Sequence, residues 1–242
     1  MTTLTGKTAI ITGASRGIGR AVAERLGRDG AAIVVAYATR EAAAAETVNA
    51  IVSAGGRATA SKADVSRLAE VRLLFDETER FFGPPDILVA VAGSMLIKPF
   101  AETVEEDYDI GLSVNARGTF MVFSEASRRI SDGGRIIGFS SSLVAQGRAG
   151  IGLYVAGKAA IEQYVKVLAK ELGPRQITVN AVAPGPTDTE LLSERGRTTA
   201  PQMTPLGRIA QPFEIADVVA FLASQQGGWV NGQVIGVNGG IV

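Results

Sequence analysis

The feature that most constrains the fold of this chain is the alternation of short apolar runs with longer amphipathic stretches. The first run, Thr8 to Thr12, is followed by a helical pattern at Ala21, Val22 and Leu26, and similar pairs continue along the chain. Strands that alternate with helices pair in parallel, and such sheets carry helices on both faces. The alternation therefore predicts an α/β fold with one doubly wound parallel sheet of about seven strands.

The spacing of apolar residues, short continuous runs for strands and a repeat of about 3.6 residues for helices, also places the other elements. Strands are expected at 31–37, 58–64, 87–91, 135–141, 177–183 and 233–238, and helices at 41–54, 67–82, 102–130, 151–172 and 212–223. The segment 187–205 shows neither period and follows a predicted strand, so we expect an irregular, mobile lid over a substrate. No linker, repeat or low-complexity tract divides the chain, and we predict a single domain over residues 1–242.

Composition excludes several kinds of chemistry. Because the chain has no Cys and no His, disulfides, thiol nucleophiles, Ser-His-Asp triads and His- or Cys-based zinc sites are impossible, and we predict no metal site. Basic and acidic residues balance at 24 each, which argues against nucleic acid as a partner. Neither a membrane span nor a secretory signal is recognisable. We expect a cytoplasmic protein that moves protons through Tyr, Lys, a carboxylate or water.

A glycine-rich turn joins the first predicted strand to the first helix. It reads Gly13-Ala-Ser-Arg-Gly17-Ile-Gly19, in the strand–turn–helix context that gives a glycine motif meaning. Glycine lets the backbone approach a pyrophosphate, and the helix N-terminus attracts its charge. The spacing differs from the general G-x-G-x-x-G fingerprint, and glycines also occur in such turns for steric reasons. We predict that the turn binds a nucleotide.

The end of the second strand bears on which nucleotide binds. In dinucleotide folds a carboxylate there binds the ribose 2′-hydroxyl of NAD. Here the chain reads Ala36-Tyr-Ala-Thr-Arg40, with no carboxylate before Glu41. Arg16 and Arg40 could converge on a 2′-phosphate, for which guanidinium groups are well suited; the alternative is that both are solvated surface residues. We predict NADP(H) rather than NAD(H).

The stretch from Ser140 to Lys158 carries the catalytic candidates. Three serines end the fifth predicted strand, and Tyr154 and Lys158 stand one helical turn apart on one face. An ammonium beside a phenol favours the phenolate, so Lys158 is expected to lower the pKa of Tyr154 from about 10. A serine hydroxyl could hold a substrate oxygen beside it. Tyr and Lys at this spacing are also common as a half-buried aromatic and a solvated amine.

Two further polar residues have two interpretations each. Asp64 ends the third predicted strand, where it could bind an adenine ring together with Val65 or cap the helix that follows. Asn115 lies within a predicted helix, although its side chain competes for backbone hydrogen bonds. A specific polar contact would explain its place there.

In their order along the chain, these motifs resemble the short-chain dehydrogenase/reductase family from end to end. The resemblance rests on Thr12-Gly13-x-x-x-Gly17-x-Gly19, Asp64-Val65, Ala92-Gly93, Asn115, Ser141 thirteen residues before Tyr154, Tyr154-x-x-x-Lys158, Pro184-Gly185, Pro205-Leu-Gly-Arg208, Phe221-Leu-Ala, Gly232-Gln-Val and Asn238-Gly-Gly. Two departures are Ala90-Val91, where the family has two asparagines, and Gly157, where Ser is common before the Lys.

The resemblance implies a Rossmann-type fold and a role for each matching residue. Tyr154 would be the general acid for ketone reduction or the base for alcohol oxidation, and Lys158 would tune it and hold the nicotinamide ribose. Ser141 would bind the substrate carbonyl, and Asn115 would hold a proton-relay water. The expected cofactor-binding residues are Gly13, Ser15, Arg16, Gly17, Ile18, Gly19, Ala38, Thr39, Arg40, Asp64, Val65, Ala92, Gly93, Tyr154, Lys158, Pro184, Gly185, Thr187 and Thr189.

The leading hypothesis is NADPH-dependent reduction of a small-molecule ketone to a secondary alcohol. Alternatives are a 3-oxoacyl-acyl-carrier-protein reductase, an NAD(P)-dependent alcohol or sugar dehydrogenase, and a non-catalytic nucleotide-binding sensor. An acyl-carrier protein could dock on Arg128 and Arg129. The family also implies a homo-oligomer, usually a tetramer, and the apolar Ile241-Val242 terminus is compatible with burial at its interface.

Overall fold

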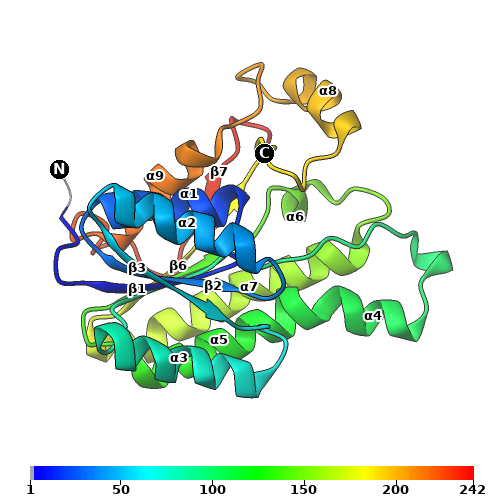
Figure 1. The fold of residues 1–242 in the computed structure, drawn as a ribbon. Coiled ribbons are helices and arrows are strands. Elements are labelled where there is room, and N and C mark those ends of the chain that lie inside the picture. The colour runs from blue at the N-terminus through cyan, green and yellow to red at the C-terminus, as the bar shows by residue number, and fades with distance from the viewer. Residues whose placement is uncertain (1–2) are drawn as a thin grey trace.

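The computed structural model describes residues 3–242, and its centre is one sheet of seven parallel strands (Figure 1). In spatial order they are β3 (Arg57–Lys62), β2 (Ala32–Tyr37), β1 (Thr8–Thr12), β4 (Ile87–Ala90), β5 (Arg135–Phe139), β6 (Thr178–Pro184) and β7 (Val234–Val237). Every neighbouring pair is parallel. The predicted fold class is confirmed, and each predicted strand end lies within two residues of the observed one.

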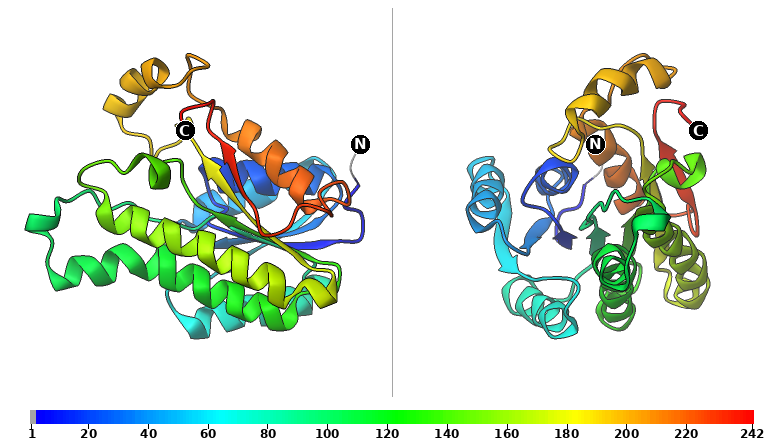
Figure 2. Two further views of the ribbon diagram at one scale, coloured as in Figure 1. Left: turned by 180° about the vertical axis from the view of Figure 1, so that it is seen from behind. Right: turned by 90° about the vertical axis from the view of Figure 1, so that its right-hand side faces the viewer.

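Helices cover both faces of this sheet (Figures 1 and 2). One face carries α1 (Gly17–Arg28), α2 (Glu41–Ser53) and α9 (Pro212–Ala223), and the other carries α3 (Leu68–Phe82), α5 (Thr119–Arg129) and α7 (Gly152–Glu171). Side chains alternate between the two cores: Ile11 packs under α1, whereas its neighbour Ile10 packs toward α3. Because both faces are buried, the central strands are almost continuously apolar.

The helix predicted over 102–130 is interrupted at its centre. It consists of the short turn η1 (Phe100–Glu102), α4 (Glu105–Leu112), a π-helical turn η2 (Ser113–Gly118) and then α5. Asn115 lies in the π turn. Two further short elements, α6 (Leu143–Gln146) and η3 (Gly173–Arg175), flank α7. Within residues 3–242, no helix has both the length and the apolar character needed to cross a bilayer.

The prediction of an irregular segment over 187–205 was wrong in part, because it contains the helix α8 (Glu194–Met203). One face of α8 carries Gly196, Thr199, Ala200 and Met203 at helical spacing. Most of these side chains are small or polar, so they give a weak apolar stripe, and Pro201 within the helix usually signals a break. Figure 1 shows α8 projecting from the body of the molecule beyond the sheet.

The order of the strands reverses between β1 and β4, which lie side by side at the sheet centre. The chain segments that follow them touch: a Cβ on Gly13 would lie 2.9 Å from the Cα of Ala92. The Ala92 N–H also donates a hydrogen bond of 3.2 Å to Oγ1 of Thr12. In open α/β sheets ligands bind in the crevice at this point of reversal.

The glycine turn is tight enough to make a specific prediction about stability. A Cβ on Gly19 would lie 2.2 Å from the carbonyl oxygen of Gly13, whereas one on Gly173 would meet nothing within 4 Å. We expect Gly19→Ala to lower the free energy of unfolding by about 1–3 kcal/mol, because the turn must open. Gly173→Ala should change it by less than about 0.5 kcal/mol. Urea denaturation measures both, and equal stability of the two variants would contradict the observed turn.

Candidate active site

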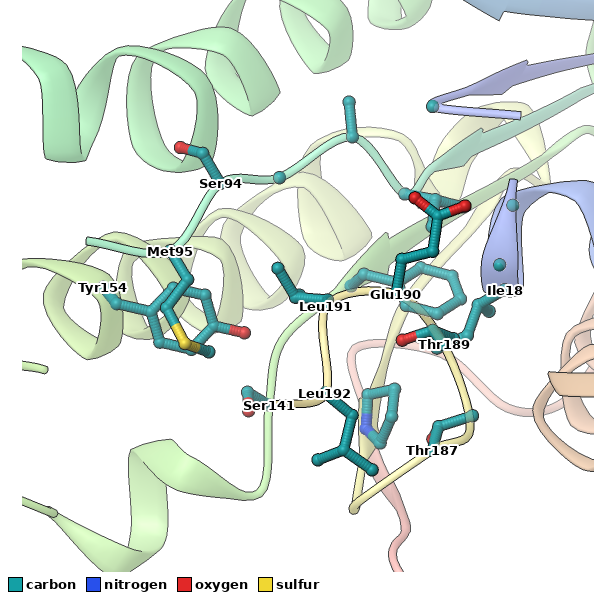
Figure 3. Close-up of a pocket in the computed structure, with 18 of the residues that line it drawn as sticks. Ile18, Ser94, Met95, Ser141, Tyr154, Thr187, Thr189, Glu190, Leu191 and Leu192 are labelled. Carbon is teal, nitrogen blue, oxygen red and sulfur yellow. The ribbon is translucent and has the colours of Figure 1, made fainter. Parts of the chain in front are cut away.

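A cavity of about 490 Å³ runs along the carboxyl ends of the strands (Figure 3). Asn115 is the one predicted site residue that does not line it. The predicted residues that do line it are Gly13, Ser15, Arg16, Gly17, Ile18, Gly19, Ala38, Thr39, Arg40, Asp64, Val65, Ala92, Gly93, Ser141, Tyr154, Lys158, Pro184, Gly185, Thr187 and Thr189. Residues from seven separate stretches of chain therefore meet in one place, because parallel strands all end at the same edge of the sheet.

The glycine turn forms one end of the cavity and fits a dinucleotide. Gly13 and Gly17 have φ of +66° and +53°, a conformation that favours glycine. No acidic residue lies in the first turn of α1, and its N-cap residue Arg16 makes no side-chain capping hydrogen bond. The first N–H groups of α1 thus lack a side-chain partner within the helix. A Cβ on Gly13 or Gly19 would collide with the backbone of Ala92 or Gly13, so the turn keeps this shape only with glycine at both positions. The N–H groups at such a helix start are suited to bind phosphate.

Arg16 and Arg40 converge at the same end of the cavity. Both Nη1 atoms donate to one oxygen of Glu190, Oε2, at 2.5 Å and 2.7 Å. These hydrogen bonds, from Arg16 first and then Arg40, hold the pKa of Glu190 below its usual value. The two arginines are therefore not isolated: they lie together on one carboxylate, although both side chains stay exposed to solvent.

Asp64 lines the cavity and also shapes the turn before α3. Its Oδ1 accepts hydrogen bonds from the backbone N–H of Ser66 at 2.9 Å and from the Ser66 hydroxyl at 2.7 Å. The Ser66 hydroxyl is the main cause of the lowered pKa of Asp64. The carboxylate thus stabilises the loop between β3 and α3 while it lines the cavity, but it does not cap α3, whose N-cap residue is Arg67. Binding of an adenine ring by Asp64 stays a prediction.

Ser141 is the serine that reaches Tyr154. Burial raises the pKa of Tyr154 above its ordinary value of 10, and a hydrogen bond with the Ser141 side chain acts in the opposite direction. Figure 3 shows both side chains at one end of the cavity. The other two serines are engaged elsewhere. Ser140 donates to Glu162 at 2.6 Å, and Ser142 accepts from Gln146 at 3.3 Å.

Lys158 is buried, with 4% of its surface exposed, and its Nζ donates to the carbonyl oxygen of Phe139 at 2.8 Å. Burial lowers the pKa of Lys158 to about 8. Its Nζ lies 6.0 Å from the centre of the Tyr154 ring. The expectation that Lys158 lowers the pKa of Tyr154 was wrong for this structure. Both groups are desolvated, which disfavours the charged form of each.

Asn115 lies behind the cavity wall, fully buried in the π turn. Its Nδ2 donates to the Ser94 carbonyl oxygen at 2.7 Å, and its Oδ1 accepts from the Ser94 N–H at 3.2 Å. A Cβ on Gly93 would lie 3.0 Å from Asn115 Oδ1 and 3.1 Å from Lys158 Nζ, so the two side chains meet beside this glycine. Gly157 has a similar role, because a Cβ there would lie 2.8 Å from the Asn115 Cβ.

The opposite end of the cavity is mainly apolar, and sequence reasoning did not identify most of its residues. They come from several loops, from α6 and from α8, and they are Met95, Leu143, Leu191, Leu192, Ala200, Met203 and Ile241, with Gln146 and Arg148 as polar members. Ile241 also lines this cavity, and burial of the Ile241-Val242 terminus at a subunit interface stays a prediction. Only the position of the 187–205 segment, directly after a strand, signalled that part of this wall.

Comparisons with known proteins agree with this geometry. A family model described as enoyl-(acyl carrier protein) reductase matches residues 13–242. The hydroxynaphthalene reductase-like protein of Metarhizium brunneum is 42% identical, over 99% of this chain and 96% of its own length.

Two solved structures extend the comparison. The angucycline C-6 ketoreductase LanV with bound NADP shares 42% identity at a TM-score of 0.95, covering 99% of this chain and 97% of its own. A short chain dehydrogenase from Burkholderia cenocepacia in complex with NADP shares 36% identity at 0.94, covering 98% of each chain. Since the family model, the sequence identity and the fold all match over nearly the whole length, the chain belongs to the short-chain dehydrogenase/reductase family of oxidoreductases.

Proposed function

We propose that the protein is an NADPH-dependent carbonyl reductase that converts a bulky apolar ketone into a secondary alcohol. One observation carries this proposal: Tyr154, Ser141 and Lys158 line the same cavity as the glycine turn and the apolar wall. A nucleotide on the turn and an apolar ketone against the wall would therefore meet at these three side chains.

NADP(H) is the cofactor that this site supports best. Two solved relatives hold NADP. In this chain Arg16 and Arg40 converge on one anion, and no carboxylate follows β2 before Glu41. The glycine turn and α1 would hold the pyrophosphate, and the two arginines the 2′-phosphate. When bound, NADPH supplies the hydride that the carbonyl carbon accepts.

Tyr154 would deliver the proton that completes the reduction. Its raised pKa keeps the phenol protonated at neutral pH, so it can donate to the carbonyl oxygen as negative charge develops there. The Ser141 hydroxyl would donate a hydrogen bond to the same oxygen. Below a pH of about 8 Lys158 is an ammonium, which would return a proton to the phenolate that remains. We assign Asn115 the role of holding the water that returns a proton through Lys158.

The raised pKa of Tyr154 suits a proton donor at neutral pH, which is the role that reduction requires. An alcohol or sugar dehydrogenase would use the same residues but needs the phenolate as its base. Burial disfavours the phenolate at neutral pH. A non-catalytic sensor has no use for a buried Lys158, whose desolvation is unfavourable for the folded state.

We further propose that the substrate is a fused-ring aromatic ketone. The substrate wall is built from leucine, methionine and isoleucine side chains. The names of two relatives refer to hydroxynaphthalene and to an angucycline. The acyl-carrier-protein alternative has less support, because Arg129 already pairs with Asp76 and Glu79, and Arg128 pairs with Glu125.

A panel of ketones tests this function. We expect NADPH consumption to be fastest with a fused-ring aromatic ketone and slower with a 3-oxoacyl thioester or a ketose. Tyr154→Phe should lower turnover by about 10²- to 10⁴-fold, because the proton donor is lost, while NADPH binding measured by fluorescence titration stays unchanged. Tyr164→Phe, in the same helix but outside the cavity, is the matched control. Near-normal turnover by Tyr154→Phe would exclude Tyr154 as the acid.

The lowered pKa of Lys158 predicts a pH-dependent change in stability. The unfolded chain holds this proton up to about pH 10.4, whereas the folded protein releases it at about 8. The buried Lys158 ammonium therefore makes its largest unfavourable contribution to folding below pH 8, and this contribution declines as the pH rises toward about 10.4. We expect the stability gained by Lys158→Met to be larger at pH 7 than at pH 10, by about 2–3 kcal/mol. Chemical denaturation measures this difference.

The exposed Lys166 of the same helix provides the control for that measurement. The effect of Lys166→Met on the free energy of unfolding should be almost the same at both pH values. Equal effects of Lys158→Met at pH 7 and pH 10 would show that the buried amine does not titrate as proposed.

Finally, we propose that the protein is a homo-oligomer, with a tetramer as the expected state. Large apolar side chains are exposed on the outer helices, among them Tyr108 and Ile110 of α4 and Phe120 of α5. Trp229, in the loop before β7, is fully exposed. Burial of such large side chains against another subunit would remove apolar surface from water. Light scattering should give the mass of an oligomer, and a monomer at micromolar concentration would refute this proposal.

A further inference from the structure

We propose that Glu190 is a reversible tether between the substrate lid and the cofactor site. Its carboxylate holds the base of the 187–205 segment on Arg16 and Arg40, and the 2′-phosphate of NADP(H) binds by taking its place. This inference rests on the NADP(H) assignment above. It goes further because it links the choice of cofactor to the release of the lid.

Three distant parts of the chain meet in this contact. Arg16 belongs to the glycine turn, Arg40 precedes α2, and Glu190 follows β6, 174 and 150 residues away from the two arginines. Both arginines donate to the same carboxylate oxygen. Neither has another ion pair among residues 3–242, so Glu190 is the anion that neutralises both of them there.

The two arginines suit a phosphate better than a carboxylate. A phosphate monoester carries close to two negative charges at neutral pH and offers three acceptor oxygens, whereas a carboxylate carries one charge and two oxygens. Guanidinium groups bind phosphate through paired N–H donors. In this proposal the 2′-phosphate takes the two Nη1 groups that now donate to Glu190, so the two anions exclude one another. NAD(H) has no 2′-phosphate and would leave the tether in place.

The contact is accessible enough to exchange. The side chains of Arg16, Arg40 and Glu190 are 44%, 48% and 59% exposed. Exposed ion pairs of this kind contribute little to stability and are readily replaced by a stronger ligand. A buried triad of the same residues would have to stay together, because an unpaired buried charge is costly.

Release of Glu190 from the two arginines would affect the substrate wall, because its neighbours in the chain contact α8. Asp188 forms an ion pair with Arg197 of α8, and Arg197 also donates to the Thr189 carbonyl oxygen at 2.9 Å. The residues next to Glu190 are thus fastened to α8, which carries Thr199, Ala200 and Met203 to the cavity. In Figure 3 Glu190 extends toward the glycine turn at Ile18, whereas Leu191 extends toward Tyr154. Glu190 therefore connects the two ends of the cavity.

Two nucleotide probes separate the tether from catalysis. Adenosine 2′,5′-bisphosphate carries the phosphate that should displace Glu190, and adenosine 5′-monophosphate lacks it. In the wild type, we expect the bisphosphate, but not the monophosphate, to increase hydrogen exchange in peptides covering 187–203. In Glu190→Gln this exchange should be fast without ligand. Its affinity for the bisphosphate, measured by calorimetry, should rise about two- to fivefold, with no change for the monophosphate.

Two further variants make the result specific. Glu194→Gln removes the same charge from the same lid but does not contact either arginine, so it should behave like the wild type. Arg40→Gln should also speed exchange in the lid, but it should weaken bisphosphate binding because it removes a phosphate donor. Opposite effects of the Glu190 and Arg40 variants on affinity are the signature of competition for one site.

The outcomes distinguish this proposal from the function on which it rests. If the wild type binds the bisphosphate no better than the monophosphate, the NADP(H) assignment fails and the tether fails with it. If the bisphosphate binds more tightly but Glu190→Gln matches the wild type in affinity and exchange, the tether alone is wrong. Weaker bisphosphate binding by Glu190→Gln would mean that Glu190 assists the cofactor, which also overturns the proposal.

Discussion

Direct backbone contact at the centre of the sheet is the constraint on which the rest of this structure depends. Where β1 and β4 end, Gly13 lies against Ala92 so closely that a Cβ would have to displace the chain, and Gly19 lies closer still to the Gly13 carbonyl. Gly93 is equally confined, because a Cβ there would lie 3.0 Å from Oδ1 of Asn115 and 3.1 Å from Nζ of Lys158. Small residues thus leave the end of the cavity at the glycine turn and the end at Tyr154 in one continuous space.

Desolvation determines the chemistry within that space. A chain without histidine has no side chain that ordinarily titrates near neutral pH, and here burial brings the pKa of Lys158 to about 8 and keeps the Tyr154 phenol protonated. The two shifts have opposite signs because one group is a cation when charged and the other an anion. Burial of a cation is unfavourable for folding, so function and stability are opposed at Lys158.

Much of the fold could be predicted from the sequence, because the spacing of apolar residues marks the strands and helices clearly. The carboxyl ends of parallel strands also lie at one edge of the sheet. That edge accounts for why Gly13, Asp64 and Ser141 share a cavity. Helix α8 was missed since its inner face consists of small residues around Pro201. The contact of Glu190 with two arginines more than a hundred residues away leaves no periodic signal. The direction of the Tyr154 pKa shift depends on burial, which residue spacing does not reveal.

The π turn η2 between α4 and α5 changes the direction in which the side chains after it project from the helix. Each residue of an α-helix advances its side chain by about 100°, and a π turn accommodates one additional residue within the helix. Side chains before and after Ser113–Gly118 therefore do not follow one uninterrupted helical stripe. Deletion of one residue here would restore α-helical hydrogen bonding but turn Asn115 away from Ser94. The length of this helix is therefore fixed to the single residue by the polar contact at its centre.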